Sequence, residues 1–347
     1  LWSVIPPSSA AALAGANLLL NPSAGDELIG KSQYRRDLVR TQSARCVAAY
    51  CYAGAGVTES TADCVFSGHC LAAENGALLL DSPRFRREDA LHFVDFDLER
   101  LENARIAETP FEDAAALAPR PNFRTVRTDP LPQSDGTLRP IDRRPLVPSG
   151  REERDARCSE IFSIQCTGLA KRMEAARAKT AVIGVSGGLD STLALLVCVK
   201  TMELLGRPAS DVTAITMPGF GTTGRTYNNA ISLCRELGVT LREIPIRDAC
   251  LEHFRSIGHD ESVRDVVYEN AQARERTQIL FDTANQERGI CIGTGDLSEA
   301  ALGWCTFNGD HMSNYAVNCD VPKTLVRYVV EWTGERSAPA VRDILRD

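Results

Sequence analysis

The clearest chemical signal in this sequence is a short glycine-rich segment. Residues 186–191 read SGGLDS and lie between an apolar run and a segment with helical spacing. The two glycines let backbone N–H groups close around an anion, and Ser191 adds a hydroxyl at a helix start, where the helix dipole also favours negative charge. Repulsion between phosphates and the carboxylate of Asp190 would be relieved by a divalent cation that bridges them. The segment has neither the lysine of a Walker A loop nor a G-x-G-x-x-G pattern, so it predicts a phosphate and metal site of another kind.

The elements around this segment are expected to hold it at the edge of a sheet. Apolar runs that predict strands alternate with longer segments of helical spacing, over residues 181–185, 191–205, 212–217, 225–237, 240–246, 268–288 and 290–293. Alternation at this spacing is typical of a doubly wound parallel sheet. Ligands of such sheets bind beyond the carboxyl ends of the strands, which is where the glycine-rich segment is expected.

The first 115 residues predict a separate layered α/β unit without a nucleotide loop. We expect helices and strands in alternation, the helices over 10–16 and 34–50 and the strands over 17–22, 51–53, 63–66, 77–80 and 91–96. Asn75-Gly76 between two apolar runs is a hairpin signal. Residues 116–150 contain seven of the 17 prolines and few large apolar side chains, so they predict an extended linker.

Composition narrows the class of protein. The 347 residues carry 39 basic and 46 acidic side chains, for a net charge of −7, which argues against a protein that coats nucleic acid. The longest apolar stretch, residues 10–20, is too short to span a bilayer, and no basic segment precedes it as in a signal peptide. None of the 12 cysteines forms a C-x-x-C pair, so we expect reduced thiols and a cytoplasmic protein. The chain begins at Leu1 and ends at Asp347 within an expected helix, which predicts a longer protein on both sides.

Segments downstream of SGGLDS resemble one enzyme family in order. The glycine-rich segment itself is similar to the loop of enzymes that cleave ATP to AMP and pyrophosphate. The later segments resemble the NAD synthetases at residues 217–223 (MPGFGTT), 268–276 (YENAQARER), 293–299 (GTGDLSE), 304–310 (WCTFNGD) and 321–324 (VPKT), and together cover most of residues 181–330. The first part resembles the nitrilase-like glutaminase domain of glutamine-dependent NAD synthetases at residues 1–2, 5–8, 30–31, 42–45, 56, 59–61 and 74–76.

The resemblance implies an α/β protein of two different domains. Residues 1–115 would be the C-terminal part of a nitrilase-like α/β sandwich domain, 116–150 a proline-rich linker, and 151–347 a doubly wound parallel-sheet ATP-pyrophosphatase domain with an incomplete C-terminus. The implied enzyme is a carbon–nitrogen ligase that amidates deamido-NAD to NAD through an acyl-adenylate, with release of AMP and pyrophosphate. Ammonia would come from glutamine in the full-length protein. This reaction is the last step of NAD biosynthesis.

The family's site residues are carried over only where its motifs match this sequence. ATP would contact Gly184, Val185, Ser186, Gly187, Gly188, Leu189, Asp190, Ser191, Thr294 and Lys323. Mg²⁺ would be held by Asp190 and Glu299. Deamido-NAD would contact Asn270, Arg274, Glu299, Trp304, Cys305, Thr306 and Phe307.

Simpler structural explanations stay open for these residues. Glu299 would be an acid favoured in the first turn of a helix, and Thr294 a hydroxyl that caps a turn. Asn270 and Arg274 would lie on an exposed helix face. Residues 304–307 would form an aromatic core, and Lys323 would be a solvated lysine. His311 is interpreted as structural rather than catalytic.

The glutaminase half is expected to be incomplete. In the family, a Cys-Glu-Asp stretch immediately precedes the Leu-Trp pair; its cysteine is the nucleophile, and the partner Glu and Lys lie further upstream. All three would fall before Leu1, so no catalytic residue of the glutaminase is expected in this chain. Lys31 and Gly25 match glutamine-binding positions, but many members have a serine where this chain has Gly25, and a surface location is the simpler explanation for Lys31.

Three other functions stay open. Another enzyme with a pyrophosphatase loop, such as a tRNA-thiolating enzyme, would need a reactive cysteine and a basic face for RNA. A free-standing nitrilase-type amidase would leave residues 181–330 unexplained, and a non-catalytic fragment would bind nucleotide without turnover. The expected partners are the small molecules deamido-NAD, ATP, and glutamine or ammonia, with no nucleic acid and no membrane. The resemblance also implies a homo-oligomer formed through the synthetase domains.

Overall fold

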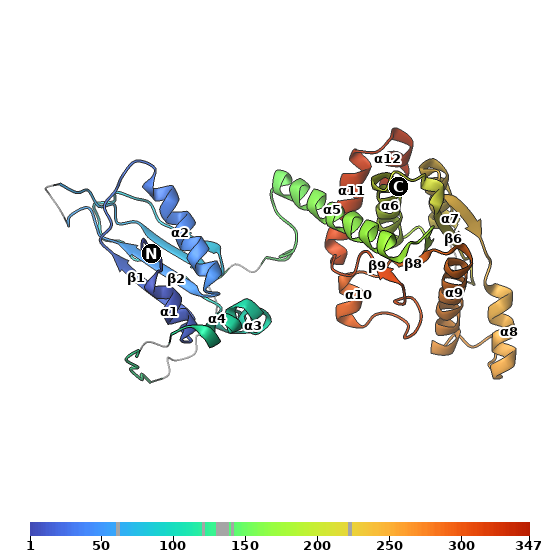
Figure 1. Ribbon diagram of the computed structural model, residues 1–347, viewed down its shortest axis with the longest axis horizontal. Helices are drawn as coiled ribbons and strands as arrows, with labels where there is room; N and C mark the ends of the chain where they lie inside the picture. Colours follow the sequence, from blue (N-terminus) through green and yellow to red (C-terminus); the bar gives the residue numbers. More distant parts are fainter. Residues whose placement is uncertain (60–62, 120–121, 130–138, 140–141, 221–223) are drawn as a thin grey trace. The chain divides into compact units, whose positions relative to one another are not determined.

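The chain forms two compact units, Leu1–Ile141 and Asp142–Asp347 (Figure 1). The computed structural model describes all residues except 60–62, 120–121, 130–138, 140–141 and 221–223. Much of the predicted linker, and parts of the family-like segments 59–61 and 217–223, therefore lie outside the described residues. Every helix within the described ranges is too short or too polar to cross a lipid bilayer.

Unit 1 is built on one mixed sheet with the strand order β1-β2-β3-β4. Its strands are β1 (Leu18–Ser23), β2 (Ala49–Gly54), β3 (Cys70–Glu74) and β4 (Ala77–Asp81). Its helices are α1 (Pro7–Leu13), α2 (Lys31–Arg45), α3 (Leu98–Ala107) and α4 (Thr109–Leu117). Strands β1 and β2 are parallel, and the other pairs are antiparallel. One core lies among α1, α2 and strands β1 to β3, with Val39, Tyr50 and Leu71 at its centre.

The β3–β4 hairpin confirms the turn predicted at Asn75-Gly76. The backbone of Asn75 has φ 44° and that of Gly76 has φ 83°, as a two-residue turn with left-handed central residues requires. The predicted helix over 34–50 is wrong at its end, because Val47 takes a positive φ of 43° and the chain then enters β2.

Two predicted strands in unit 1 are wrong. The described residues 63–66 and 91–96 form loops. Leu91 and Phe93 are 78% and 74% exposed, and the run pairs with no strand among the described residues. Its last residue, Phe96, packs against the small core of Val47, Ala49 and Leu101 from a loop. Apolar alternation produces a strand only where another strand supplies hydrogen-bond partners, and the sequence pattern does not show that partner.

Unit 2 contains one parallel sheet with the strand order β7-β6-β5-β8-β9. Its strands are β5 (Ala181–Gly184), β6 (Val212–Thr216), β7 (Thr240–Glu243), β8 (Ile290–Gly293) and β9 (Tyr315–Ala316). Its helices are α5 (Arg151–Ala176), α6 (Leu189–Leu204), the 3₁₀ turn η1 (Ala209–Asp211), α7 (Gly224–Leu237), α8 (Arg247–Ile257), α9 (Val266–Glu287), α10 (Leu297–Leu302), α11 (Lys323–Glu335) and α12 (Pro339–Arg346). The doubly wound fold predicted for this part is confirmed.

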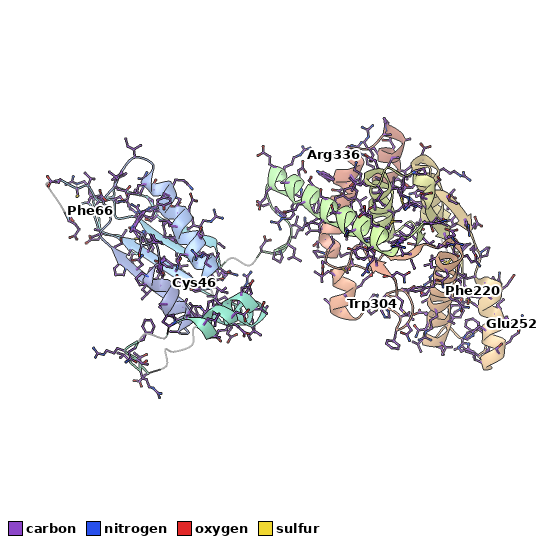
Figure 2. The ribbon with its side chains drawn as sticks, viewed as in Figure 1. Cys46, Phe66, Phe220, Glu252, Trp304 and Arg336 are labelled. Atoms are coloured by element: carbon purple, nitrogen blue, oxygen red, sulfur yellow. The ribbon has the colours of Figure 1, made fainter. Side chains whose placement is uncertain are left out.

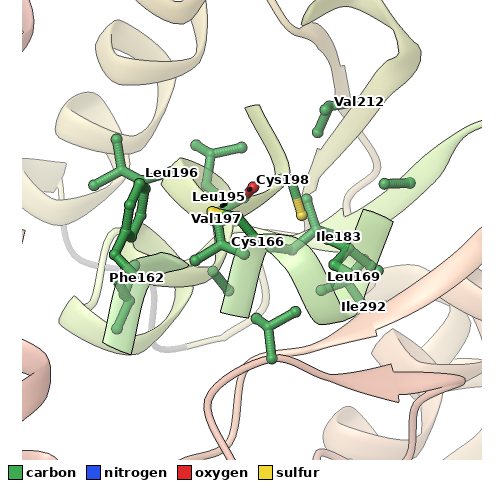
Figure 3. Close-up of a cluster of buried hydrophobic side chains, with 14 of the residues drawn as sticks. Phe162, Cys166, Leu169, Ile183, Leu195, Leu196, Val197, Cys198, Val212 and Ile292 are labelled. Atoms are coloured by element: carbon green, nitrogen blue, oxygen red, sulfur yellow. Dashed lines mark hydrogen bonds between the residues drawn. The ribbon is translucent and has the colours of Figure 1, made fainter. Parts of the chain in front are cut away.

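Both faces of this sheet are covered by helices. Ile183 of β5 lies in the larger core with residues of α5, α6 and α11, part of which Figure 3 shows. Its neighbour Val182 points to the opposite face and packs against Ala284 of α9, because successive strand residues alternate between faces. Burial from both sides explains why β5 and β8 are continuously apolar.

The strand order places a reversal between β5 and β8. From β5 the chain moves outward to β6 and β7, and it then returns to the other side of β5 as β8. The loops after β5 and β8 therefore leave the sheet at adjacent carboxyl ends, which is where ligands bind in open α/β sheets.

Candidate functional site

The loop between β5 and α6 is held tightly against α7. Gly187 has φ +81°, and a Cβ atom there would lie 2.1 Å from the backbone oxygen of Thr226. Only glycine fits this approach. The Oγ atom of Ser191 donates to the carbonyl oxygen of Gly188 at 3.1 Å and accepts from the N–H of Ser186 at 3.3 Å. The loop is thus shaped by its own hydroxyl groups at the N-terminus of a 16-residue helix.

Three carboxylates meet beside this loop. Asp190 of α6, Asp296 and Glu299 each offer an oxygen within 4.8 Å of the others. Asp296 caps α10 by accepting the N–H of Glu299 at 2.8 Å, and Glu299 accepts the N–H of Asp296 in return. This reciprocal cap fixes two of the three carboxylates. The Asp190 Oδ1 atom is buried and has no hydrogen-bond partner among the described residues.

Lys323, the first residue of α11, neutralises this cluster. Its Nζ atom lies 2.6 Å from Asp190 Oδ2, 3.1 Å from Asp296 Oδ2 and 3.5 Å from Glu299 Oε1. Burial acts to lower the pKa of Lys323, but the hydrogen bonds from its ammonium to Asp190 and Asp296 outweigh burial and raise that pKa. The lysine is therefore positively charged at neutral pH.

The cluster has the chemistry of a site for a hard divalent cation. Such cations prefer carboxylate oxygens, and the unpartnered Oδ1 of Asp190 offers one more donor. The structure brings together Asp190 and Glu299, the pair predicted from the sequence, and adds Asp296, which sequence reasoning missed. A signal for Asp296 was present, because the residue lies three positions after the end of β8 and caps the start of α10.

Asn318 ties the ends of β5 and β8 together and was also missed. This side chain is fully buried. Its Nδ2 atom donates to the carbonyl oxygens of Asp190 at 2.9 Å and Thr294 at 3.1 Å. Gln165 of α5 donates to its Oδ1 atom at 2.9 Å. Asn318 therefore sets the spacing between the two loops, and Thr294 joins the site through its backbone.

A second group of predicted residues lies where α9 meets the loop after α10. Asn270 accepts a hydrogen bond from the hydroxyl of Thr306 at 2.9 Å, and Arg274 donates to the carbonyl oxygen of Phe307 at 3.3 and 3.2 Å. Trp304 and Phe307 are 82% and 74% exposed, and Figure 2 labels Trp304. The interpretation of residues 304–307 as an aromatic core is wrong, because these rings face solvent.

Two predicted residues of unit 1 lie on either side of Trp2. The Lys31 Nζ atom is 5.1 Å from the centre of the Trp2 ring and 2.6 Å from Asp26 Oδ1. A Cβ atom on Gly25 would lie 3.6 Å from the Trp2 indole nitrogen and 3.5 Å from the Tyr52 hydroxyl, so the space at Gly25 admits a side chain. The Tyr52 hydroxyl is buried and has no hydrogen-bond partner within the described part of the chain.

Comparison with known proteins gives one consistent family. The NAD synthase family model matches residues 161–341, more than half of the chain. Glutamine-dependent NAD(+) synthetase of Mycobacterium leprae is 45% identical over 340 residues, covering 94% of this chain and 50% of its own length. The enzyme of the same name from Mycobacterium tuberculosis (strain H37Rv) is 44% identical over 356 residues, covering 98% and 52%. The chain therefore spans about half the length of the curated relatives it matches.

Solved structures agree on the fold. A glutamine-dependent NAD+ synthetase from Acinetobacter baumannii, in complex with ADP, superposes with a TM-score of 0.51 at 21% identity, covering 97% of this chain and 55% of its own. A glutamine-dependent NAD(+) synthetase from Cytophaga hutchinsonii gives a TM-score of 0.50 at 20% identity, with the same coverage. At this identity the likeness shows the α/β fold with its parallel sheet.

Proposed function

The chain belongs to the NAD synthase family, and we propose that unit 2 catalyses the ATP-dependent amidation of deamido-NAD to NAD. The observation that carries the proposal is the SGGLDS loop beside three carboxylates and a lysine at the reversal of strand order. A carboxylate oxygen of deamido-NAD attacks the α-phosphorus of ATP, the bond between the α- and β-phosphates breaks, and pyrophosphate leaves. Ammonia then attacks the acyl carbon of the adenylate, AMP leaves, a proton is lost, and the amide of NAD remains.

The loop residues are the proposed ATP site. Residues 184–191 present backbone N–H groups and the positive end of α6 to the phosphates, and Thr294 and Lys323 complete the set. Asp190, Asp296 and Glu299 would hold Mg²⁺, which supplies charge neutralisation at the phosphates when bound. The reciprocal cap between Asp296 and Glu299 orients these carboxylates before any ligand arrives, so little reorganisation is needed during the reaction.

The surface formed by α9 and residues 304–307 is the proposed deamido-NAD site. The exposed rings of Trp304 and Phe307 offer flat apolar faces on which a nicotinate ring can stack. Asn270 and Arg274 position this segment through their hydrogen bonds to Thr306 and Phe307. The backbone N–H of Trp304 donates to the carbonyl oxygen of Glu299 at 3.0 Å, which connects the two proposed sites. Cys305 lies within the same exposed segment.

Unit 1 is proposed to belong to the part that supplies ammonia. The curated relatives are named as glutamine-dependent enzymes, and Lys31 and Gly25 are the proposed glutamine contacts. Burial raises the pKa of nine of the twelve thiols, which keeps them protonated and poorly nucleophilic; these are Cys46, Cys51, Cys158, Cys166, Cys198, Cys234, Cys250, Cys291 and Cys319. We therefore propose that glutamine hydrolysis does not use these nine cysteines; the family resemblance implies a nucleophilic cysteine just upstream of the Leu-Trp pair.

The remaining proposals concern organisation. We assign residues 1–115 to part of a nitrilase-like glutaminase domain, 116–150 to a linker and 151–347 to the synthetase domain. The cysteines are all free thiols, which suits the reducing cytoplasm. The family resemblance also supports a homo-oligomer formed by the synthetase domains.

The test is NAD formation by the purified 347-residue chain. ATP, Mg²⁺ and deamido-NAD are supplied with ammonium in one reaction and with glutamine in another. We expect NAD with ammonium only, and loss of at least about 100-fold in rate for Asp190→Asn, whereas Asp248→Asn on the exposed face of α8 leaves the rate unchanged. A folded chain that makes no NAD from ammonium contradicts the synthetase proposal, and NAD from glutamine contradicts the assignment of the nucleophile.

A further inference from the structure

The Lys323 ammonium stands in the space that a divalent cation would need. Its Nζ atom lies within 3.5 Å of an oxygen from each of Asp190, Asp296 and Glu299, and the three carboxylates each offer an oxygen within 4.8 Å of the others. A cation bound by all three would have to lie among the same carboxylates, and two positive charges at so short a separation repel strongly. The ammonium and the metal therefore exclude each other from the centre of the cluster.

We propose that Lys323 is the resident counter-ion of this cluster and leaves it when a divalent metal enters together with nucleotide phosphate. Only the identity of the nucleotide rests on the proposed function. The lysine thereby couples the two ligands: metal alone must displace a bound cation without compensation, whereas a metal–phosphate complex also gives the ammonium a new anionic partner. We therefore expect the nucleotide-free chain to bind the metal alone weakly and to bind the metal–nucleotide complex tightly.

The cluster needs a cation at all times. The Asp296 side chain is fully buried, and a buried carboxylate without a compensating charge is strongly unfavourable. The Lys323 ammonium meets this need in the ligand-free protein. The buried Oδ1 of Asp190, which lacks a hydrogen-bond partner among the residues described, shows that the lysine leaves part of the cluster's ligand capacity unused.

The lysine is anchored at its backbone and free to move at its tip. Its N–H donates to Ser298 Oγ at 3.1 Å, which ties the start of α11 to α10. Its side chain remains 46% exposed, in contrast to the enclosed Asp296. A long flexible stem on a fixed helix end lets the ammonium change partners without movement of the sheet.

The experiment measures Mn²⁺ binding to the nucleotide-free 347-residue chain by electron paramagnetic resonance. We expect Lys323→Gln to bind Mn²⁺ about tenfold more tightly than the native chain, within the range usual for coupled ligands. Lys323→Arg, which keeps the charge, should stay close to native. Arg327→Gln, which removes an exposed cation one turn further along α11, is the matched control and should change nothing.

A double variant locates the metal. Adding Glu299→Gln to Lys323→Gln should reverse the gain, since it removes one of the three carboxylates. Lys323→Gln binding no more tightly than the native chain, or a gain that survives the second substitution, would overturn the proposal. Because no turnover is involved, failure of the NAD assay leaves these readings intact, and failure here leaves the proposed reaction intact.

A measurement on the native chain tests the proposal without any substitution, so its result does not depend on whether a variant folds. Acetylation of lysines, followed by mass spectrometry, reports how available the Lys323 amine is. We expect slow modification in the ligand-free chain and several-fold faster modification of Lys323 alone once Mn²⁺ saturates the cluster. Unchanged modification of Lys323 at saturating Mn²⁺ would show that the lysine stays in place and would refute the displacement.

Discussion

Gly187 is the residue on which the shape of the phosphate loop depends most directly. Its positive φ and the 2.1 Å approach to the Thr226 backbone oxygen leave no room for a side chain. The neighbouring Gly188 has φ −79°, and a Cβ atom there would lie 3.4 Å from Ser186 Oγ. The two glycines of one motif therefore differ: Gly187 makes the turn possible, whereas the backbone at Gly188 leaves room for a Cβ atom.

This difference gives a prediction for stability. Gly187→Ala should lower the free energy of unfolding by about 3 kcal/mol, because it combines a left-handed Cβ, about 1–2 kcal/mol, with overpacking, about 1–3 kcal/mol. Gly188→Ala should change it by less than about 1 kcal/mol. Urea unfolding of the two variants is the measurement, and equal effects of the two substitutions would contradict the contact with Thr226.

Single residues also show which parts of the candidate site could be predicted from the sequence alone. Asp190 and Glu299 were identifiable because each lies in a short motif at a strand end, and the fold brings both together with Lys323. Asn318 was not identifiable: its role depends on two carbonyl oxygens, 128 and 24 residues away along the chain. Contacts of that length follow from the tertiary fold and leave no local pattern.

At the level of elements, hydrogen bonds made by side chains of α9 hold the segment after α10, residues 304–310, in position. Three of its side chains, Asn270, Arg274 and Arg276, contact Thr306, Phe307 and Asp310. The exposed rings of that segment are not buried in a core, so these polar contacts hold their position. Preorganisation of exposed groups in this way reduces the entropy lost when a ligand binds.

Loss of one of these contacts should therefore weaken substrate binding more than it lowers the stability of the fold. We predict that Arg274→Ala raises KM for deamido-NAD about tenfold, equivalent to about 1.4 kcal/mol, with a change in unfolding free energy below about 0.5 kcal/mol. Steady-state kinetics with ammonium measures the effect. Arg255→Ala, on the exposed face of α8, is the control. A large drop in kcat at unchanged KM would show that Arg274 acts in another way.

Prediction of elements was most accurate for the central strands of unit 2. The strands β5, β6 and β8 were predicted within one residue, because short runs of apolar and β-branched residues bounded by polar turns are typical of central parallel strands. Strand β3 and helices α5 and α8 were not predicted, and the strands expected at 63–66 and 91–96 are absent from those described segments. Strand β3 lies between β2 and β4, and α5 packs in the larger core, so these elements depend on neighbours distant in the sequence more than on their own pattern.

At the scale of the whole molecule, each unit holds its own network of charged side chains, and the network of unit 1 is centred on the buried Arg35. The Arg35 side chain is 1% exposed and contacts Glu27 Oε1 at 2.6 Å and His69 Nδ1 at 2.9 Å. The other ring nitrogen of His69 lies 2.8 Å from Asp81 Oδ1. Since Arg35 can only donate, His69 Nδ1 accepts, and the neutral ring donates from Nε2 to Asp81.

The network makes the stability of unit 1 depend on pH. Burial, with help from Arg35, lowers the pKa of His69 below its ordinary 6.5 despite Asp81. Burial acts to raise the pKa values of Glu27 and Asp81, but hydrogen bonds from Ser67 and Arg35 to Glu27, and from Arg36 and His69 to Asp81, lower them below 4.5 and 3.8. All three groups bind protons more readily unfolded, so stability falls as pH falls.

The pH ranges over which stability changes follow from the directions of these pKa shifts. We predict that these three groups leave stability unchanged above about pH 7, that His69 causes a loss as pH falls below about 6.5, and that the carboxylates cause a further loss below about 4.5. His69→Gln should abolish the first loss and keep the second, whereas His92→Gln, outside the network, should keep both. Thermal unfolding across pH 3–8 measures this, and stability that rises as pH falls from 7 to 5 would contradict the network.

The central claim is that unit 2 activates a carboxylate of deamido-NAD with ATP. The most direct measurement is exchange of labelled pyrophosphate into ATP by the 347-residue chain, with Mg²⁺ and deamido-NAD present and ammonium absent, because only reversible formation of the acyl-adenylate returns the label. The account predicts exchange that requires deamido-NAD and disappears in Asp190→Asn. A folded chain that shows no exchange with deamido-NAD, or that exchanges equally well without it, would contradict the account.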